Sequence, residues 1–298
     1  MSNPDPAVPV AEDAVKVASD PYASVDRLPT QVIRATRGWG RVNLSRLWEY
    51  RDLVWFLTWR DIQLRYRQTA LGVAWAVIQP VAPMVIFSVF FGRLARLPSD
   101  GAPYPLFAFC GLLPWQLFAF ALTESSNSLV SNQSLITKIY FPRLVIPLSA
   151  VLAGLVDFAI SFVLLLIMML WYHVFPTIRV LVLPFFLLLA VTTALGTGLW
   201  LSALNVQYRD VRYTIPFLTQ FWLYATPIAY SSSLVPDKWR PLVGLNPIAG
   251  VVEGFRWALL GTGAIPKLIW VSAIVSILLL YTGVRYFSKM ERAFADIV

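Results

Sequence analysis

The sequence predicts an all-α integral membrane protein, and three features of its composition carry that prediction. Of the 298 residues, 58% are hydrophobic and only 13% are charged, roughly half the charged share of an ordinary soluble domain. Long uncharged stretches also recur along the chain, and a helix needs about 20 mostly apolar residues to cross a bilayer. This composition excludes a soluble enzyme of ordinary build, because too few charges remain to cover its surface.

Six uncharged stretches are long enough to predict six transmembrane helices. The fifth contains Pro216 and Pro227, which interrupt a helix. The last is short, and its polar end groups must extend outward to the headgroups. The stretches lie between Arg67 and Arg93, Asp100 and Glu124, Asp157 and Arg179 (with an apolar start near Val145), Arg179 and Arg209, Arg212 and Asp237, and Lys267 and Arg285.

Basic residues predict the orientation of these spans. Most of the 24 Lys and Arg residues fall in the N-terminal part of the chain and in loops on one side, and the rest, including Arg256, fall on the other side. Positive charge collects on the cytoplasmic side, so both termini are expected there. Residues 1–36, rich in proline and without a long apolar run, are expected to form a disordered cytoplasmic tail.

Composition also limits the chemistry of the chain. The net charge of +8 suits contact with anionic lipid headgroups, and too few polar positions remain for a nucleic-acid groove. With one cysteine, Cys110, and one histidine, His173, we expect no metal site and no catalytic residues. Cys110 is interpreted as a small buried hydrophobe.

Residues 47–67 are apolar but too charged to be a span. Polar residues such as Asp52 and Arg60 fall on one stripe of a helix, whereas Trp55 and Trp59 fall on another sector. Tryptophan prefers the boundary between lipid tails and headgroups, so we interpret this segment as an amphipathic helix in the membrane interface. A cytosolic helix packed on a partner is the alternative.

Two further features lie in the membrane region. The loop 231–266 is too charged for a clean span, and we expect short re-entrant helices there on the outer side. Asp157 is the one acid well inside a predicted span. It is either a functional group or a neutral carboxyl hydrogen-bonded to a neighbouring helix.

A short loop after the second span has the character of a docking surface. Apolar Ile139, Tyr140 and Phe141 stand beside Lys138 in a segment predicted to be cytoplasmic, and exposed apolar groups favour an interaction site. Simple skimming of the membrane surface is the alternative. Residues 261–267 contain glycines and a lysine but lack the phosphate-loop spacing, so any ATPase that drives transport is expected to be a separate chain.

Four motifs in order resemble one family. Residues 64–80 read LRYRQTALGVAWAVIQP, residues 135–143 read LITKIYFPR, residues 205–210 read NVQYRD, and residues 245–247 read LNP. They resemble the motifs of ABC transporter permeases that export cell-surface polysaccharides, such as O-antigen and teichoic acids. The resemblance covers about residues 40–290.

The resemblance implies an ATP-driven exporter in the bacterial inner membrane. The permease would be a homodimer paired with two copies of a nucleotide-binding ATPase subunit, which would bind ATP and Mg; this chain would hold no cofactor. The cargo would be a glycan linked to undecaprenyl diphosphate, most often an O-antigen. The chain would divide into the tail (1–36), an interfacial gate-helix region (37–73) and a six-span permease domain (74–290).

Three groups of residues are then expected to carry the function. Aromatic rings of the first and fifth spans would line the substrate channel, cations of the gate helix would bind the lipid diphosphate, and the short loop would couple to the ATPase. The channel group is Trp75, Phe87, Phe90, Phe91, Phe217, Phe221, Trp222 and Tyr224; the lipid-head group is Arg60, Arg65 and Arg67; the coupling group is Thr137, Lys138, Ile139, Tyr140, Phe141 and Arg143.

Three other functions compete with this one. An exporter of drugs or small lipids would share the fold. A carrier or channel without an ATPase is disfavoured, because ion or proton coupling needs more intramembrane charge than this chain has. A membrane-embedded glycan enzyme would need surface carboxylates beyond Asp237 and Glu253.

Overall fold

A computed structural model describes residues 44–67, 73–208, 210–262, 268–291 and 294, all of which belong to a compact unit that covers 39–298. The tail expected over 1–36 lies outside the described residues. All regular elements within the described residues are helices, which confirms the all-α prediction. In chain order they are α1 (Leu44–Glu49), α2 (Arg51–Arg67), α3 (Val73–Phe87), the π-helix η2 (Ser88–Leu94), α4 (Tyr104–Ser131), α5 (Gln133–Lys138), α6 (Val145–Trp171), the 3-10 helix η3 (Ile178–Val182), α7 (Leu183–Gln207), α8 (Val211–Ala225), the 3-10 helix η4 (Ser232–Leu234), α9 (Arg240–Leu245), α10 (Pro247–Leu260) and α11 (Leu268–Met290).

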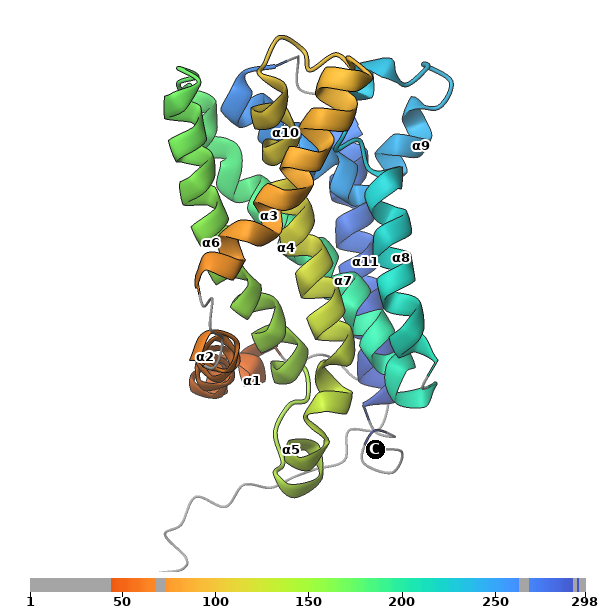
Figure 1. The fold of residues 1–298 in the computed structure, drawn as a ribbon. Coiled ribbons are helices and arrows are strands. Elements are labelled where there is room, and N and C mark those ends of the chain that lie inside the picture. The colour runs from red at the N-terminus through yellow and green to blue at the C-terminus, as the bar shows by residue number, and fades with distance from the viewer. Residues whose placement is uncertain (1–43, 68–72, 209, 263–267, 292–293, 295–298) are drawn as a thin grey trace, which may run out of the picture. The chain divides into compact units, whose positions relative to one another are not determined.

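Five helices of the described chain are long and apolar enough to cross a membrane. Figure 1 shows them running between two ends, one with α2 and α5 and the other with α9 and α10. We call these the inner and the outer end. The view looks down the axis of α2, which therefore lies across the long helices, as an interfacial helix does. The spanning stretches are Ala74–Leu94, Tyr104–Ser131, Val145–Trp171, Ile178–Gln207 and Ile269–Met290.

The fifth predicted span is shorter than expected. Helix α8 has 15 residues, which is about 22 Å of helix against a hydrocarbon core of about 30 Å. It ends at Ala225 because Thr226 precedes Pro227 and takes an extended conformation, with φ −100° and ψ 134°. The chain from 226 to 231 continues without helix. This crossing therefore stays a prediction, with α8 as its helical part.

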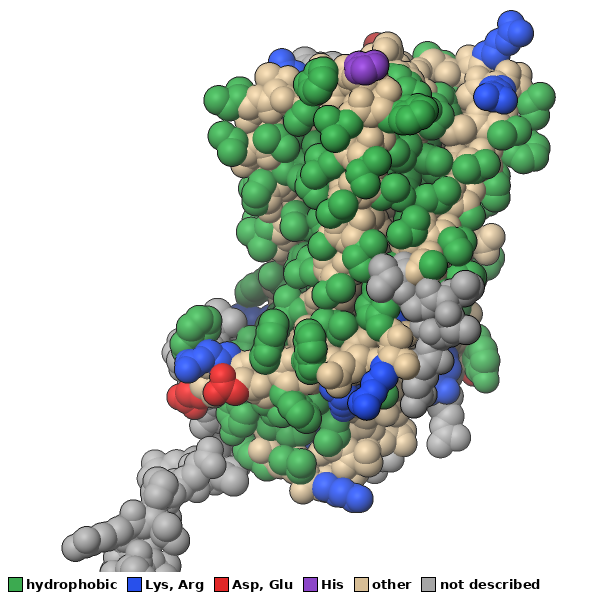
Figure 2. Space-filling view, turned by 60° about the vertical axis from the view of Figure 1, so that its left-hand side comes forward, with side chains coloured by type: hydrophobic (Ala, Val, Ile, Leu, Met, Phe, Trp, Pro, Cys, Tyr) green, Lys and Arg blue, Asp and Glu red, His purple; other side chains and the backbone are tan. Residues whose placement is uncertain are grey.

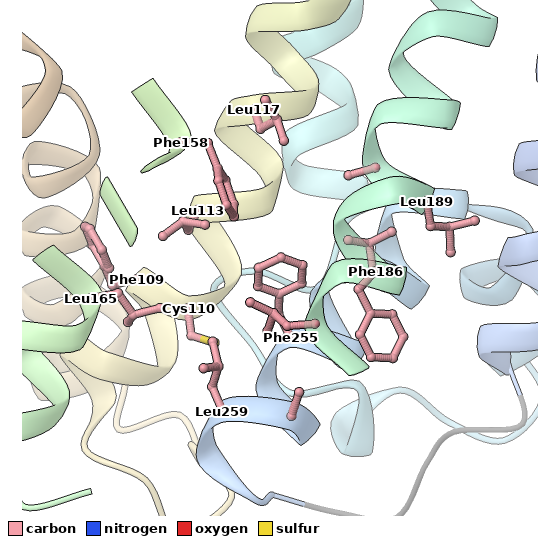
Figure 3. Packing of buried hydrophobic residues seen from close by; sticks show 14 of the residues in the cluster. Phe109, Cys110, Leu113, Leu117, Phe158, Leu165, Phe186, Leu189, Phe255 and Leu259 are labelled. Atoms are coloured by element: carbon pink, nitrogen blue, oxygen red, sulfur yellow. The ribbon is translucent and has the colours of Figure 1, made fainter. Parts of the chain in front are cut away.

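Helix α4 is the centre of the bundle. Its membrane stretch is 78% buried, against 11–33% for the other four. Aromatic and aliphatic side chains of α4, α6, α7 and α10 meet in one apolar cluster, in which Phe158 and Phe255 pack edge to face at 6.1 Å. Figure 3 shows Phe255 of α10 lying between α4 and α7. Cys110 lies in the same cluster and is fully buried, as the sequence predicted.

The surface has the distribution expected of a membrane protein. In Figure 2 hydrophobic side chains cover the middle of the visible face, and Lys and Arg side chains gather toward its two ends. Large apolar side chains such as Ile167 on α6 and Ile274 on α11 are more than half exposed. Patches of this extent on a folded chain face lipid or another protein.

Helices α7 and α11 cross with their backbones in contact. A Cβ added to Gly283 would collide with the carbonyl oxygen of Gly196, and one added to Gly196 would lie 2.5 Å from the backbone nitrogen of Leu280. The hydroxyls of Thr193 and Ser276 meet nearby at 2.8 Å. Close approach through small residues and an interhelical hydrogen bond are the means by which helices associate within lipid.

We expect Gly283→Leu to destabilise the protein by about 1–3 kcal/mol or more, because the added side chain must push α11 away from α7. The matched control is Ala159→Leu on the exposed side of α6, which adds the same kind of bulk where nothing opposes it. The measurement is the melting temperature of the detergent-solubilised protein. Equal melting temperatures for the two variants would contradict the close crossing.

Candidate functional site

Helix α5 forms a protruding tip at the inner end (Figure 1). Ile136 and Phe141 are buried, with 5% and 6% of their surface exposed, and they fix the two sides of the tip in an apolar cluster. Between them Thr137, Lys138, Ile139 and Tyr140 are all exposed. Of the predicted coupling residues, these four form one accessible surface, whereas Phe141 points inward to hold it.

Arg143, the last of the coupling group, binds the end of the chain instead of facing outward. Its backbone N–H donates to Glu291 Oε1 at 3.1 Å, and its guanidinium donates to the carbonyl oxygen of the same residue. The guanidinium also lies 5.9 Å from the ring centre of Phe294, which is fully buried against Phe287. Glu291 and Phe294 were not among the predicted site residues, because no local sequence pattern marks them.

The three gate-helix cations differ in their surroundings. Arg60 donates to Asp61 at 2.7 Å and to Asn132 Oδ1 at 2.9 Å. Arg65 forms an ion pair with Asp157 of α6. Arg67, at the end of α2, is exposed. Arg67 is therefore the member of this group whose side chain is open to a ligand in this conformation, and lipid-head binding by the group stays a prediction.

Asp157 accepts hydrogen bonds from two neighbouring residues of α2. The guanidinium of Arg65 and the hydroxyl of Tyr66 both donate to its carboxylate. Burial, followed by this hydrogen bond, raises the pKa of Tyr66 above its ordinary value, so the hydroxyl keeps its proton and remains a donor. The intramembrane acid that the sequence singled out is thus the point at which α2 is fastened to α6.

The predicted channel aromatics divide into five exposed residues, a partly buried pair, and one residue that packs on the bundle. Trp75 of α3, Phe90 of η2, and Phe217, Phe221 and Tyr224 of α8 are each more than half exposed, so most of each side chain is left uncovered by this chain. Phe87 and Phe91 are partly buried and contact each other edge to face at 5.6 Å.

Trp222, by contrast, packs edge to face on Phe118 of α4 at 5.0 Å, on the side of α8 that faces the bundle.

Asn246 joins the end of α8 to the start of α10. Its Oδ1 accepts from the backbone N–H of Ile248 at 3.2 Å and from the indole of Trp222 at 2.9 Å, and its Nδ2 donates to Thr226 Oγ1 at 2.9 Å. Asn246 is thus the N-cap of α10, and Pro247 follows at the first helical position, where a missing N–H costs nothing. The LNP motif is therefore a junction between two helices.

Arg256 of α10 is almost fully buried, with 2% of its surface exposed. Its guanidinium donates to the carbonyl oxygens of Pro227 at 2.7 Å and Ile228 at 2.6 Å, and it lies 3.6 Å from the ring centre of Phe107. Glu253, one turn earlier, completes the charge balance at 3.4 Å. From the sequence, Arg256 was predicted to be one of the charges of the outer loop. Glu253, three residues earlier, is the sequence feature that could have indicated a paired and buried arginine.

The rest of the non-helical segment after α8 is also held by polar side chains. The hydroxyl of Tyr104 donates to the carbonyl oxygen of Ala229, and the carboxylate of Asp100 accepts from the hydroxyls of Ser231 and Ser233. The short outer helices expected over 231–266 are present as η4, α9 and α10. Helix α10 is more deeply buried than expected, since most of its side chains lie in the core.

Metal binding has no obvious location in the part of the chain that the structure describes, where His, Cys, Asp and Glu side chains form no group of three or more. The candidate functional surfaces are the exposed tip of α5, helix α2 with its ion pair to α6, and the outward aromatic faces of α3 and α8. A docking surface, an interfacial helix and apolar walls are the parts expected of a membrane transport subunit.

Residues 52–260 match the model of a known family, the ABC-2 type transporter. The chain therefore belongs to the ABC-2 type transporter family and is a multi-pass membrane protein. This confirms the resemblance carried by the four sequence motifs. A transporter of this kind works with a partner ATPase subunit.

Similar proteins are known from several bacteria. The chain is 29% identical to the O-antigen export system permease protein RfbA of Myxococcus xanthus over 259 residues, which cover 85% of this chain and 98% of that protein. It is also 29% identical to RfbA of Klebsiella pneumoniae, over 83% of this chain and 95% of that protein. The polysialic acid transport protein KpsM of Escherichia coli is 24% identical, over 78% of this chain and 92% of that protein.

We expect Arg256→Met to destabilise the protein by about 3–5 kcal/mol, because it leaves the partly buried Glu253 unpaired and two carbonyl oxygens without donors. Arg240→Met is the matched control. Arg240 also pairs with an acid three residues earlier, Asp237 at 2.7 Å, but that pair is exposed and is worth about 1 kcal/mol at most. Heating followed by size-exclusion chromatography measures the folded fraction. An equal loss of folded protein in both variants would contradict the structural role of the buried Arg256.

Proposed function

We propose that this chain is the membrane subunit of an ATP-driven exporter of cell-surface polysaccharide, with an O-antigen type of glycan as its cargo. One observation carries the proposal: the chain is similar to O-antigen export permeases over 95–98% of their length. The similarity to polysialic acid transport proteins is lower, which supports polysaccharide as the cargo class and favours O-antigen within it. The similarity gives no support to a drug exporter, or to a carrier without an ATPase.

The exposed aromatic faces suit a sugar polymer. Sugars present apolar C–H faces that pack on aromatic rings, and rings can line a pore without gripping one particular sugar. Helix α3 is the least buried of the spanning helices, at 11%, and Ile215 is the buried residue of α8. Two such faces become a lined channel when a second copy of the chain covers them, so we propose a homodimer with the channel between its subunits.

The remaining parts of the proposal concern the partner and the membrane. The exposed tip of α5 docks into an ATPase subunit, present in two copies, which binds ATP and Mg. Both ends of the chain and the tip lie on the cytoplasmic side of the bacterial inner membrane. The glycan is carried on undecaprenyl diphosphate, whose phosphates meet the cations of α2 at that surface, beginning with the exposed Arg67.

The function is tested by purifying the tagged chain from its own membranes with any bound ATPase and reconstituting the complex in vesicles. We expect ATP hydrolysis that rises when lipid-linked glycan is added, and glycan that becomes accessible across the vesicle membrane. Hydrolysis that responds to drugs and not to glycan would refute the cargo. A chain without any associated ATPase would refute the mechanism.

We expect Lys138→Glu and Tyr140→Ala to lower the amount of ATPase that copurifies with the chain. The first reverses the charge of the exposed tip and the second removes its largest apolar group, which is 66% exposed. Lys289→Glu is the control, because it makes the same charge change at another exposed position near the inner end. Undiminished copurification with both tip variants would place the docking site elsewhere.

We expect Phe221→Ala to reduce export several-fold with little change in the amount of folded protein, because this residue is 65% exposed and contributes little to packing within the chain. The control is Phe185→Ala on α7, which removes a partly exposed ring outside the α3 and α8 faces. Glycan export per folded permease is the measurement. A larger defect in the Phe185 variant would show that these aromatics meet lipid and not the cargo.

A further inference from the structure

The coupling tip and α2 belong to one packed body at the inner end of the bundle. Helix α2 packs chiefly on α6, the helix that follows the tip. Val54 and Leu57 of α2 lie in the same buried cluster as Ile136 and Phe141, which fix the two sides of the tip. A force applied to the tip therefore meets α2 through a close-packed apolar contact, which transmits displacement with little compression.

Two polar links join the same elements at points that flank the tip in the chain. On one side, Arg60 donates to Asn132 at 2.9 Å, immediately before α5. On the other side, Arg65 and Tyr66 donate to Asp157, which lies well inside α6. Helix α2 is thus tied to the segment before the tip and to the helix after it.

The link at Asp157 is partly shielded from water: 36% of the Arg65 side chain and 25% of the Asp157 side chain are exposed. The ring of Phe120 from α4 covers the guanidinium of Arg65 at 3.8 Å. That ring has room because residue 154 is glycine, where a Cβ would lie 2.6 Å from Phe120 Cδ1. Partial covering strengthens an ion pair only modestly, and the directional hydrogen bonds to one carboxylate set the position of the helix end.

We propose that Asp157 is a positioning residue for transport. Through Arg65 and Tyr66 it fastens the end of α2 to α6, so that α2 moves with the segment containing α5 and α6 as one body. Movement of α5 by the ATPase then reaches α2, and the start of α3 a few residues further along the chain. This inference rests on the proposed function, in which the ATPase acts at α5.

The first test is Asp157→Asn, which removes the charge and keeps the shape. We expect the ATPase to copurify and to hydrolyse ATP within about twofold of the wild-type rate, while export per ATP hydrolysed falls roughly tenfold. Asp52→Asn is the matched control, because its carboxylate is exposed on α2 and only 3.8 Å from Arg51 at the surface. Full export by the Asp157 variant, or an equal loss of hydrolysis and export, overturns the proposal.

A charge exchange guards against a variant that simply folds poorly. Arg65→Asp and Asp157→Arg should each abolish export as single changes. Combined, the two changes restore an ion pair with the charges exchanged between α2 and α6. We expect the double variant to recover a measurable fraction of the wild-type export per ATP hydrolysed. No recovery in a double variant that is present at wild-type amounts overturns the pairing as the functional contact.

A distance measurement separates this inference from the proposed cargo. Spin labels at Gln63→Cys on α2 and Ile167→Cys on α6, both exposed sites, are compared with and without ATP in the complex with the ATPase, after the buried Cys110 is replaced by alanine. We expect an unchanged distance in the native chain and a broadened one with Asp157→Asn. This readout needs no glycan, so an incorrect cargo leaves it intact. A distance that changes with ATP in the native chain overturns the one-body movement.

Discussion

Backbone groups that water cannot reach must find partners within the protein, and this constraint shapes the whole outer half of the structure. Helix α8 stops at Ala225, and the carbonyl oxygens that follow would be unpaired in an apolar layer. Arg256 supplies donors to Pro227 and Ile228, and Tyr104 supplies one to Ala229. A buried cation is costly unless it is paired and hydrogen-bonded, so α10 carries its own counter-charge in Glu253. The short helix α10 thus supplies the donors that the non-helical segment after α8 needs.

The sequence was informative for features that depend on local composition alone. Low charge and long apolar stretches predicted the membrane class and six spans, of which five are helices long and apolar enough to cross a membrane within the described residues. The local mixture of Lys138 with apolar neighbours predicted the exposed tip. Hydropathy did not predict the surroundings of charged residues whose partners are distant in the chain. It counts Arg256 as a loop charge, because the carbonyl oxygens that bind it lie 28 and 29 residues away in the chain. It isolates Asp157 as an unexplained acid, because Arg65 is 92 residues distant.

The predicted site residues show the same distinction. Arg65 and Arg67 are equivalent in the sequence, since both are gate-helix cations two positions apart. In the structure one is covered by Phe120 and bound to Asp157, and the other is exposed. Trp222 and Phe221 are adjacent aromatics of one helix, yet one packs on the bundle and the other is exposed, because neighbours on a helix point about 100° apart. Residue type predicted the kind of chemistry, and tertiary contacts assigned it to individual side chains.

The two ends of the molecule are therefore held in different ways, and that difference has a mechanical consequence. The outer end is fixed by polar contacts from four segments that converge on residues 226–233, and α8 is anchored there through Asn246. The inner end is tied to the exposed tip through α2 and α6. A helix anchored at one end turns about that end when the other is displaced. Movement that begins at the inner end can thus change the spacing of the aromatic faces of α3 and α8 there, while the outer end keeps its geometry.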